Sequence, residues 1–508
     1  IIQDAIPCQN PPHLKASPCP AGGCTVSGIW GARLAIWRRE SASKGWSRWP
    51  ASVTAIKLSS GGGFLRLSRG LDAPVEKKQA LETTRRAIAD EAFKVRHRTT
   101  DKVFTRVRRL PFALVLTLVL RKSMKSLQNV VNEAMGWLDA EPVTASALSQ
   151  ARYKFKHGAF IELNTTAVVN TVYGDGHYQT FWGRRILAVD GSKILLPDSA
   201  EVRAAFGTIA YSDGTTGNVV GERPYALASV LYDVLNRVGV DAVLGQADAY
   251  EVDLAVGHLA HTRPGDLLLM DRNYPSYRML AELSQRDRDF AIRCSAASFA
   301  VARRMLKGEG ADSQLATLTP CAGQAPDIRV RGLPRSLTVR FVRVRLSTGE
   351  LEVLVTSLLD TVSYPTADFL ELYGLRWGLE TFYGVLKTRL GLENFTGTGA
   401  EAIRQDFHAA VYLTGLEAIL TADAQTVLDA KTVQHPQTVN RAVSFNAIKY
   451  RALDLLFSDL DTATLCRQLT ALFLTNPTTD RPQRNPPRKK SSSRALLDFH
   501  KRRKKHCY

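Results

Sequence analysis

The spacing of apolar residues changes along the chain, from helical spacing to strand spacing and back. From about residue 76 the pattern is helical: residues 77–94 are charged, and residues 110–138 are apolar with recurrence at threes and fours. Short apolar runs bounded by Asp, Asn, Gly or Pro dominate residues 186–355, which is typical of strands. Helical spacing returns at residue 367. The pattern therefore predicts an α/β middle segment between two helical regions.

Two of the expected strands end at an aspartate. An apolar strand that begins at Ile186 stops at Asp190, and another that begins at Leu267 stops at Asp271. Further strands are expected at residues 226–232, 238–244, 336–346 and 351–355. Side chains at strand ends leave the core while their backbone stays rigid, so ligands gather there in open α/β sheets. Taken singly, each aspartate is better explained as a turn former or a helix cap.

Residues 367–390 are expected to form one long helix. Its core stripe consists of Leu372, Leu375, Leu379, Phe382, Leu386 and Leu390. Offset by about one residue lies a second, mixed face, made of Tyr373, Arg376, Glu380, Tyr383 and Lys387. A solvated helix with one surface ion pair explains this face. A Glu at the rim of the core, between two cations, can instead enter a Mg²⁺ site while its neighbours hold phosphates.

The charge of the chain points to a polyanionic partner. The 508 residues include 67 Lys and Arg against 48 Asp and Glu, a net charge of +19, which favours nucleic acid or an anionic membrane surface. The longest apolar run, residues 110–120, is too short for a membrane span of about 20 residues, so we expect a buried helix there. Seven Cys fit a reducing cytosol.

A short helix is expected over residues 145–156, with Thr144 as its N-cap. Its small side chains come early and its cations come late, among them Arg152 and Lys154. Such a helix can lie on DNA with these two cations as contacts. A solvated helix end beside a domain joint has the same pattern, and both interpretations stay open.

Four residues of the mixed face lead to a known family. Tyr373, Arg376, Glu380 and Lys387 have the spacing of the Tyr-Arg-Glu-Lys signature, so the chain resembles bacterial DDE transposases of the insertion-sequence-four family. The segments ILAVDGSKILLP, which contains Asp190, and GDLLLMDRNYPSY, which contains Asp271, resemble that family's two aspartate strands. The resemblance extends from about residue 98 to residue 490.

The resemblance implies an α/β fold, with a ribonuclease H-like catalytic core and a β-rich insertion, plus helical N-terminal DNA-binding and helical C-terminal regions. The expected order is a poorly ordered extension outside the family match (1–75), the N-terminal DNA-binding region (76–160), the first part of the core (161–294), the insertion (295–355), the second part of the core with the Glu helix (356–425), the C-terminal helical region (426–480) and a basic tail (481–508).

The resemblance also implies a chemistry. Asp190, Asp271 and Glu380 would be catalytic and would hold two Mg²⁺ ions, for which Mn²⁺ can substitute. Tyr373, Arg376 and Lys387 would contact phosphates at the transposon end. Such enzymes act as dimers on double-stranded DNA, cleave at terminal inverted repeats and join the freed 3′-hydroxyls to target DNA. A bacterial cytoplasmic, nucleoid-associated protein without a membrane partner is expected.

In one alternative, the protein has the same fold but no longer has the DNA-cleaving activity. A decayed or repurposed copy would bind DNA, for example as a repressor, and would no longer cut it. A standalone ribonuclease H-like nuclease is disfavoured because it would not need the Tyr-Arg-Glu-Lys residues. ATP-driven and zinc-protease functions have no support, since the sequence has neither a Gly-x4-Gly-Lys-Ser/Thr loop nor a His-Glu-x2-His motif.

Overall fold

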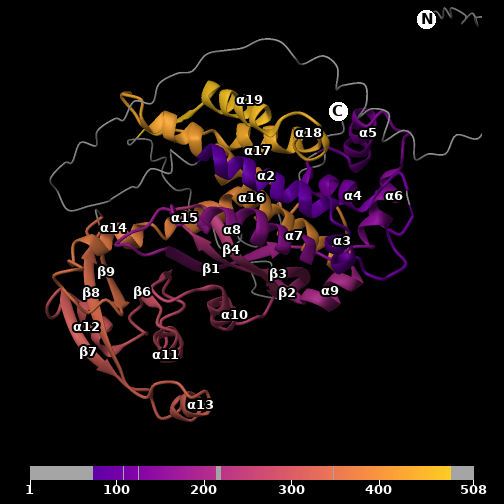
Figure 1. The fold of residues 1–508 in the computed structure, drawn as a ribbon. Coiled ribbons are helices and arrows are strands. Elements are labelled where there is room, and N and C mark those ends of the chain that lie inside the picture. Colours follow the sequence, from indigo (N-terminus) through magenta and orange to yellow (C-terminus); the bar gives the residue numbers. More distant parts are fainter. Residues whose placement is uncertain (1–72, 107, 124, 213–218, 347, 482–508) are drawn as a thin grey trace, which may run out of the picture. The chain divides into compact units, whose positions relative to one another are not determined.

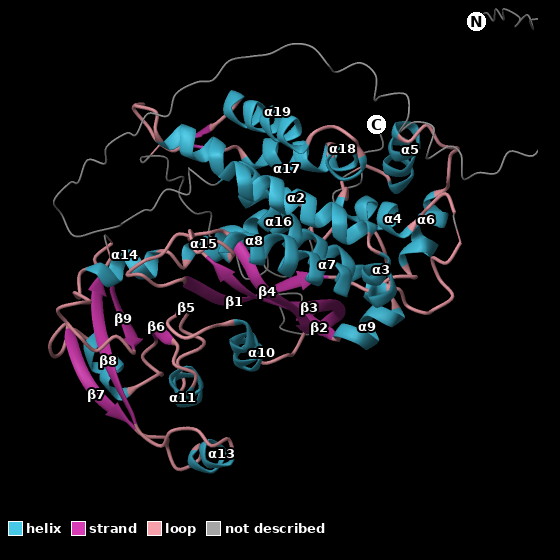
Figure 2. Ribbon diagram, viewed as in Figure 1, coloured by secondary structure: helices cyan, strands magenta, loops and turns pink. Residues whose placement is uncertain are grey.

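A computed structural model describes residues 73–106, 108–123, 125–212, 219–346 and 348–481. Most of the expected extension at residues 1–75 and nearly all of the basic tail lie outside these described residues. Within them, helices pack on both faces of one large sheet (Figures 1 and 2).

The sheet has nine strands in the order β2-β3-β1-β5-β6-β9-β8-β7, with β4 paired to β3. The strands are β1 (Ile186–Leu195), β2 (Thr208–Ser212), β3 (Val219–Asp233), β4 (Val238–Gln246), β5 (Leu267–Met270), β6 (Asp289–Cys294), β7 (Ser313–Leu318), β8 (Leu337–Arg345) and β9 (Leu351–Thr356). β1, β3 and β4 are antiparallel neighbours, whereas β5 and β6 run parallel to β1. This is the ribonuclease H-like arrangement, and the predicted fold class is confirmed.

Helices before the sheet form the N-terminal part of the described chain. They are α2 (Ala73–Ala89), α3 (Glu91–His97), α4 (Phe112–Leu120), α5 (Leu127–Trp137), α6 (Ala145–Arg152), α7 (Gly158–Leu163), a π-helix (Asn164–Val169) and α8 (Asn170–Tyr173). The Thr144 hydroxyl accepts the N–H of Ala147, so the predicted N-cap of α6 is confirmed. The apolar run at α4 is buried, as expected. The helices of the described ranges include none with the length and apolar content to cross a membrane.

The remaining helices lie between and after the strands. They are α9 (Ala200–Phe206), α10 (Glu251–His258), a 3₁₀ turn (Leu259–His261), α11 (Tyr277–Gln285), α12 (Ala300–Leu306), α13 (Ala325–Val330), α14 (Asp368–Gly374), α15 (Trp377–Gly384), a π-helix (Val385–Arg389), α16 (Ala400–Asp429), α17 (Arg441–Tyr450), α18 (Ala452–Phe457) and α19 (Thr462–Thr475); a two-stranded pair joins β10 (Gln437–Thr438) to β11 (Thr478–Thr479). α16 packs against α2, α4, α7 and α19 as well as β4, so its residues 405–421 are buried around the whole circumference of the helix.

The central strands are apolar on both faces because both faces are covered. In β1, Ile186 and Ala188 join the core under α14, α15 and α16, whereas Leu187 and Val189 join the core with α10 and α11. Figure 1 shows α10 and α11 on the opposite side of the sheet from α16. Burial on both faces explains the continuous apolar runs that the sequence pattern identified as strands.

An ion pair fixes the start of the parallel strands. Arg185, one residue before β1, donates from Nε and Nη2 to the two carboxylate oxygens of Asp266, one residue before β5, at 2.8 and 2.5 Å. Both side chains are almost fully buried. This bidentate pair holds β1 and β5 in register at the edge opposite to Asp190 and Asp271.

Two local predictions are wrong. β1 does not stop at Asp190 but continues to Leu195, because it stays paired with β3 over its whole length. The helix expected over residues 367–390 is not continuous: α14 ends at Gly374 and α15 begins at Trp377. Between them the N–H groups of Leu375 and Arg376 bond three residues back instead of four, so the helix tightens there. The apolar stripe keeps its spacing through this break, which explains why the pattern did not reveal it.

Candidate active site

Two aspartates lie side by side at one edge of the sheet. Val189 of β1 pairs with Met270 of β5 in parallel register, and the next residues along the two strands are Asp190 and Asp271. β5 ends there, whereas β1 continues beside β3 alone. The ends of adjacent parallel strands thus bring together two carboxylates that are far apart in the sequence.

The surroundings of Asp190 disfavour its negative charge. Burial raises the pKa of Asp190 to about 6; the charges of Asp271 and Glu251 add to this shift, while the Gly191 N–H and Arg376 oppose it. Oδ1 of Asp271 is buried and has no hydrogen-bond partner among the described residues. A buried carboxylate oxygen without a partner costs free energy, which a bound cation would relieve.

Glu380 does not join the two aspartates in this structure. Its side chain, on α15, is 41% exposed and its Oε1 accepts a hydrogen bond from Nη2 of Arg376 at 2.9 Å. The Arg376 side chain is only 3% exposed, and its charge is felt by Asp190 and Asp271. Arg376 therefore lies between the aspartate pair and Glu380. Across the described ranges, no three His, Cys, Asp or Glu side chains gather closely enough to hold a metal ion.

The other residues of the predicted mixed face are largely internal. Tyr373 is buried, and its hydroxyl donates to the Met270 carbonyl at 3.4 Å, directly before Asp271. The Arg376 guanidinium lies over the Tyr373 ring, 5.5 Å from its centroid. Lys387 is partly exposed and donates to the Lys193 carbonyl in β1 at 2.7 Å, and burial lowers the pKa of Lys387. Tyr373 and Lys387 thus tie the helices to the two aspartate strands.

Three further side chains lie near the aspartates. The Tyr383 hydroxyl, on the mixed face, donates to the Asp190 carbonyl at 2.8 Å and to the Ala228 carbonyl at 3.1 Å. Tyr274 and Glu251 were not identified from the sequence. Tyr274 follows Asp271 by three residues, a proximity that could have drawn attention to it. Glu251 is distant in the sequence from both aspartates, and no local pattern marks it.

The family comparison agrees with this geometry. Residues 181–414, which include both aspartates and Glu380, match the family model described as "Transposase DDE domain". This part of the chain is similar to DDE transposase domains.

Two individual proteins are also similar to the chain. It is 25% identical over 305 residues to the transposase InsG for insertion sequence element IS4 of Escherichia coli strain K12, covering 58% of this chain and 65% of that protein. The match therefore spans slightly less than two thirds of that relative. A cryo-EM structure of a piggyBac transposase synaptic complex with hairpin DNA superposes with a TM-score of 0.39 and 8% identity, covering 85% of this chain and 90% of that chain.

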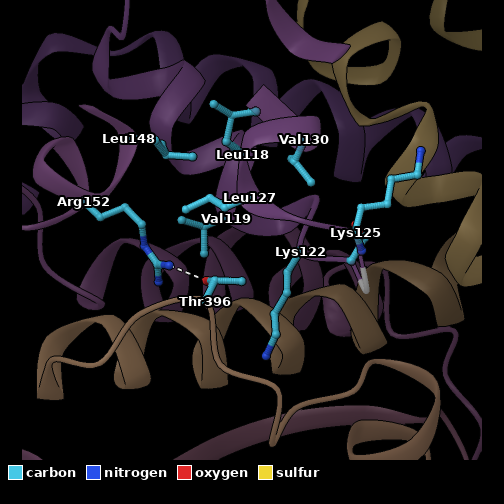
Figure 3. A pocket seen from close by; sticks show the side chains of 10 residues that line it. Leu118, Val119, Lys122, Lys125, Leu127, Val130, Leu148, Arg152 and Thr396 are labelled. Carbon is cyan, nitrogen blue, oxygen red and sulfur yellow. Dashed lines mark hydrogen bonds between the residues drawn. The ribbon is translucent and has the colours of Figure 1, made fainter. Parts of the chain in front are cut away.

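The structure contradicts the prediction that Arg152 contacts DNA. Its side chain is 4% exposed and points from α6 towards the DDE domain, as Figure 3 shows for its bond to Thr396. Its guanidinium also donates to Gln405 Oε1 at 3.1 Å and to Asp406 Oδ1 at 2.8 Å. Arg152 therefore joins the N-terminal helices to α16 and is not available to a DNA backbone.

Lys154 has a different environment. It is partly exposed and lines an open groove of about 910 Å³ on the N-terminal helical part. Four further cations line this groove: Lys102, Arg106, Arg108 and Arg109. Arg109 is paired with Glu141, but the groove as a whole carries more cations than acidic groups. That Lys154 contacts DNA stays a prediction.

The raised pKa of Asp190 predicts a pH-dependent stability of the metal-free protein. A carboxyl group whose pKa is higher in the folded state destabilises the fold once it ionises, so wild-type stability should fall between about pH 4 and pH 6. Asp190→Asn should remove this fall and stabilise the protein by about 1–3 kcal/mol above pH 7. Urea unfolding in the presence of a chelator measures both effects. Asp253→Asn, at an exposed aspartate, should keep the wild-type pH profile.

Proposed function

We propose that the protein is a transposase that binds the terminal inverted repeats of an insertion sequence, cleaves the DNA ends by metal-dependent phosphodiester hydrolysis and transfers the 3′-hydroxyl ends to target DNA. One observation carries this proposal: Asp190 and Asp271 lie side by side at the edge of a ribonuclease H-like sheet, within the residues that match the transposase DDE domain. We expect it to act as a homodimer on double-stranded DNA, in the bacterial cytoplasm at the nucleoid.

The two aspartates fit a hard divalent cation. Carboxylate oxygens are the ligands that Mg²⁺ prefers, and Mg²⁺ commonly uses one or two of them together with water and substrate phosphates. The unpartnered Oδ1 of Asp271 is a ligand atom of this kind. When bound, Mg²⁺ or Mn²⁺ would supply the Lewis acidity for hydrolysis, and two such ions can serve the attacking and the leaving oxygen.

Glu380 would complete the site after a local exchange of partners. In the free protein Arg376 holds the Glu380 carboxylate. A DNA phosphate is a bidentate partner for a guanidinium, as good as a carboxylate, so DNA at this edge would compete for Arg376. We infer that DNA binding releases Glu380 towards the aspartates, while Arg376, Tyr373 and Lys387 position the DNA end.

The cation-lined groove supplies a surface for the rest of the DNA. Lys102, Arg106, Arg108 and Lys154 contribute positive charge to it from two separate segments of the N-terminal helical part. Such groups bind phosphates irrespective of sequence, and each phosphate contact adds about 0.9 to the slope of log affinity against log salt. We therefore assign non-specific affinity and DNA alignment to the groove, and chemistry to the aspartate edge.

The test is binding and cleavage of one labelled duplex that carries the terminal repeat found beside the reading frame. The full chain should retard this duplex in a gel shift and, with Mg²⁺ or Mn²⁺, nick it at the repeat boundary to leave a 3′-hydroxyl. Chelation should abolish nicking and spare binding. Alanine at Arg106, Arg108 and Lys154 together should flatten the salt dependence of binding by two to three phosphate contacts, about 2–3 in slope.

The outcomes separate the two functions compatible with the fold. Binding without nicking, with either cation and at any pH, would identify a copy that recognises DNA as a repressor does. Failure to bind the repeat more tightly than a scrambled duplex would contradict the proposal. Glu141→Gln, which removes an acidic neighbour of Arg109 at the groove, is the matched control and should not weaken binding.

A further inference from the structure

Glu251 lies against the strand that carries Asp190. It is the first residue of α10, which packs on β1 and β3. A Cβ atom built on Gly191 would lie 2.9 Å from Oε1 and 3.0 Å from Cδ of Glu251. The Glu251 carboxylate thus occupies the space that the Cβ atom of any residue other than glycine would fill at position 191. Glu251 forms no ion pair with the residues that the structure describes.

A buried hydroxyl points into the same place. Tyr274 is 0% exposed, and its hydroxyl has no hydrogen-bond partner within the described part of the chain. Burial raises the pKa of Tyr274, and the charges of Asp190, Glu251 and Asp271 raise it further, so these three carboxylates lie near the ring's polar end. A protonated, unpartnered donor among three carboxylates indicates a polar site that is built for a further ligand.

The position of α10 is fixed at its other end. His258, the last residue of the helix, is fully buried and bonds Asp241 Oδ2 through Nδ1 at 2.6 Å and Ser229 Oγ through Nε2 at 3.0 Å. Ser229 belongs to β3 and Asp241 to β4, so the helix is fastened to two strands of the sheet. Glu251 is therefore held at the aspartate edge by a rigid element.

We propose that Glu251 is a further carboxylate of the active site and contributes to divalent-cation binding with Asp190 and Asp271. The inference rests on the proposed function, because it concerns the same site. Mg²⁺ gives up its water reluctantly and keeps several molecules when protein carboxylates bind it. Glu251 would accept hydrogen bonds from that water, an arrangement that needs no third carboxylate in direct contact. Partners of this kind commonly change metal affinity by about 10–100-fold.

The experiment measures Mn²⁺ binding to the full chain without DNA, by electron paramagnetic resonance of the free ion. Glu251→Gln should weaken Mn²⁺ binding about tenfold or more, and Asp190→Asn should weaken it at least as much. Asp253→Asn is the matched control: it lies on the same helix, carries the same charge, is 56% exposed and pairs with Arg278. Its Mn²⁺ affinity should equal that of the wild type.

A second variant keeps the charge and moves it. Gly191→Ala places a methyl group where the Glu251 carboxylate lies, and the end of that flexible side chain can swing away at little cost in stability. Mn²⁺ binding should fall as in Glu251→Gln, with an unchanged melting temperature. If Glu251→Gln does not fold, Gly191→Ala decides the question.

The possible failures are distinct. Wild-type affinity in Glu251→Gln or, where that variant does not fold, in Gly191→Ala, together with weakened binding in Asp190→Asn, would overturn the role of Glu251 and leave the proposed function intact. Unchanged affinity in all variants, Asp190→Asn included, would remove the cation site and with it the proposed function. A loss in Asp253→Asn equal to that in Glu251→Gln would reduce the effect to net charge and also overturn the role of Glu251.

Discussion

Asp190→Asn and Asp271→Asn should each lower Mg²⁺-dependent nicking of the end duplex by several orders of magnitude. Both changes keep the size of the side chain and remove the charge that a cation needs, so the Lewis-acid contribution to hydrolysis is lost. Single-turnover nicking of the labelled duplex gives the rate directly. Asp253→Asn, with the same chemical change at an exposed site, should cut at the wild-type rate.

Binding of the uncut duplex should respond in the opposite sense. The two aspartates lie together, so each removed charge reduces repulsion of a phosphate at that edge, and the gel-shift affinity should stay equal or rise. Arg376→Ala should weaken end binding first and slow cleavage through lost positioning. If these residues had no role towards DNA, the aspartate variants and Arg376→Ala should change binding and cleavage only slightly.

Among the residues of α15, Glu380 gives the clearest separation between an effect on stability and an effect on nicking. The Glu380 side chain is 41% exposed, and a glutamine can still accept the hydrogen bond of Arg376, so Glu380→Gln should change the free energy of unfolding by less than about 1 kcal/mol. If DNA releases the carboxylate towards Asp190 and Asp271, the same variant should lose nicking as severely as the aspartate variants. Nicking at the wild-type rate would exclude Glu380 from the chemistry.

The aspartate strands could be predicted because their signal is local. β5 has the predicted bounds, Leu267–Met270, since a strand buried on both faces must be a continuous apolar run, and Asp271 marks its end. That Asp190 and Asp271 are neighbours follows from the parallel register of β1 and β5. The sequence pattern alone does not contain this register, and the resemblance to a known family implied only that the two aspartates share a site.

The features that the sequence did not reveal depend on distant partners. Arg152 has the spacing of an exposed cation at a helix end, but its partner Asp406 lies 254 positions further along the chain. Glu251 became visible only through its contact with Gly191. The break before α15 leaves the apolar stripe intact, so hydrophobic periodicity cannot detect it.

The buried pair of Arg152 and Asp406 should dominate the stability of the joint between the N-terminal helices and α16. The Asp406 side chain is 0% exposed and also faces Lys122, with Nζ 3.6 Å from Oδ2. Burial by itself raises the pKa of Asp406, but Arg152, Lys122 and Thr396 lower it below its ordinary value, which indicates a carboxylate that is charged and well paired.

Asp406→Ala should therefore lower the free energy of unfolding by about 3–5 kcal/mol, because it removes the carboxylate that neutralises two buried cations. Arg152→Met should cost less, since Lys122 still neutralises Asp406 and the methionine fills part of the space. Urea unfolding measures both changes, and Arg203→Ala, at an exposed pair with Asp198, should change stability by less than about 1 kcal/mol.

At a temperature where all variants are folded, Arg152→Met should bind DNA with the wild-type salt dependence, whereas Lys154→Ala should lose about one phosphate contact. Equal losses of DNA affinity in these two variants would return Arg152 to the DNA-binding surface.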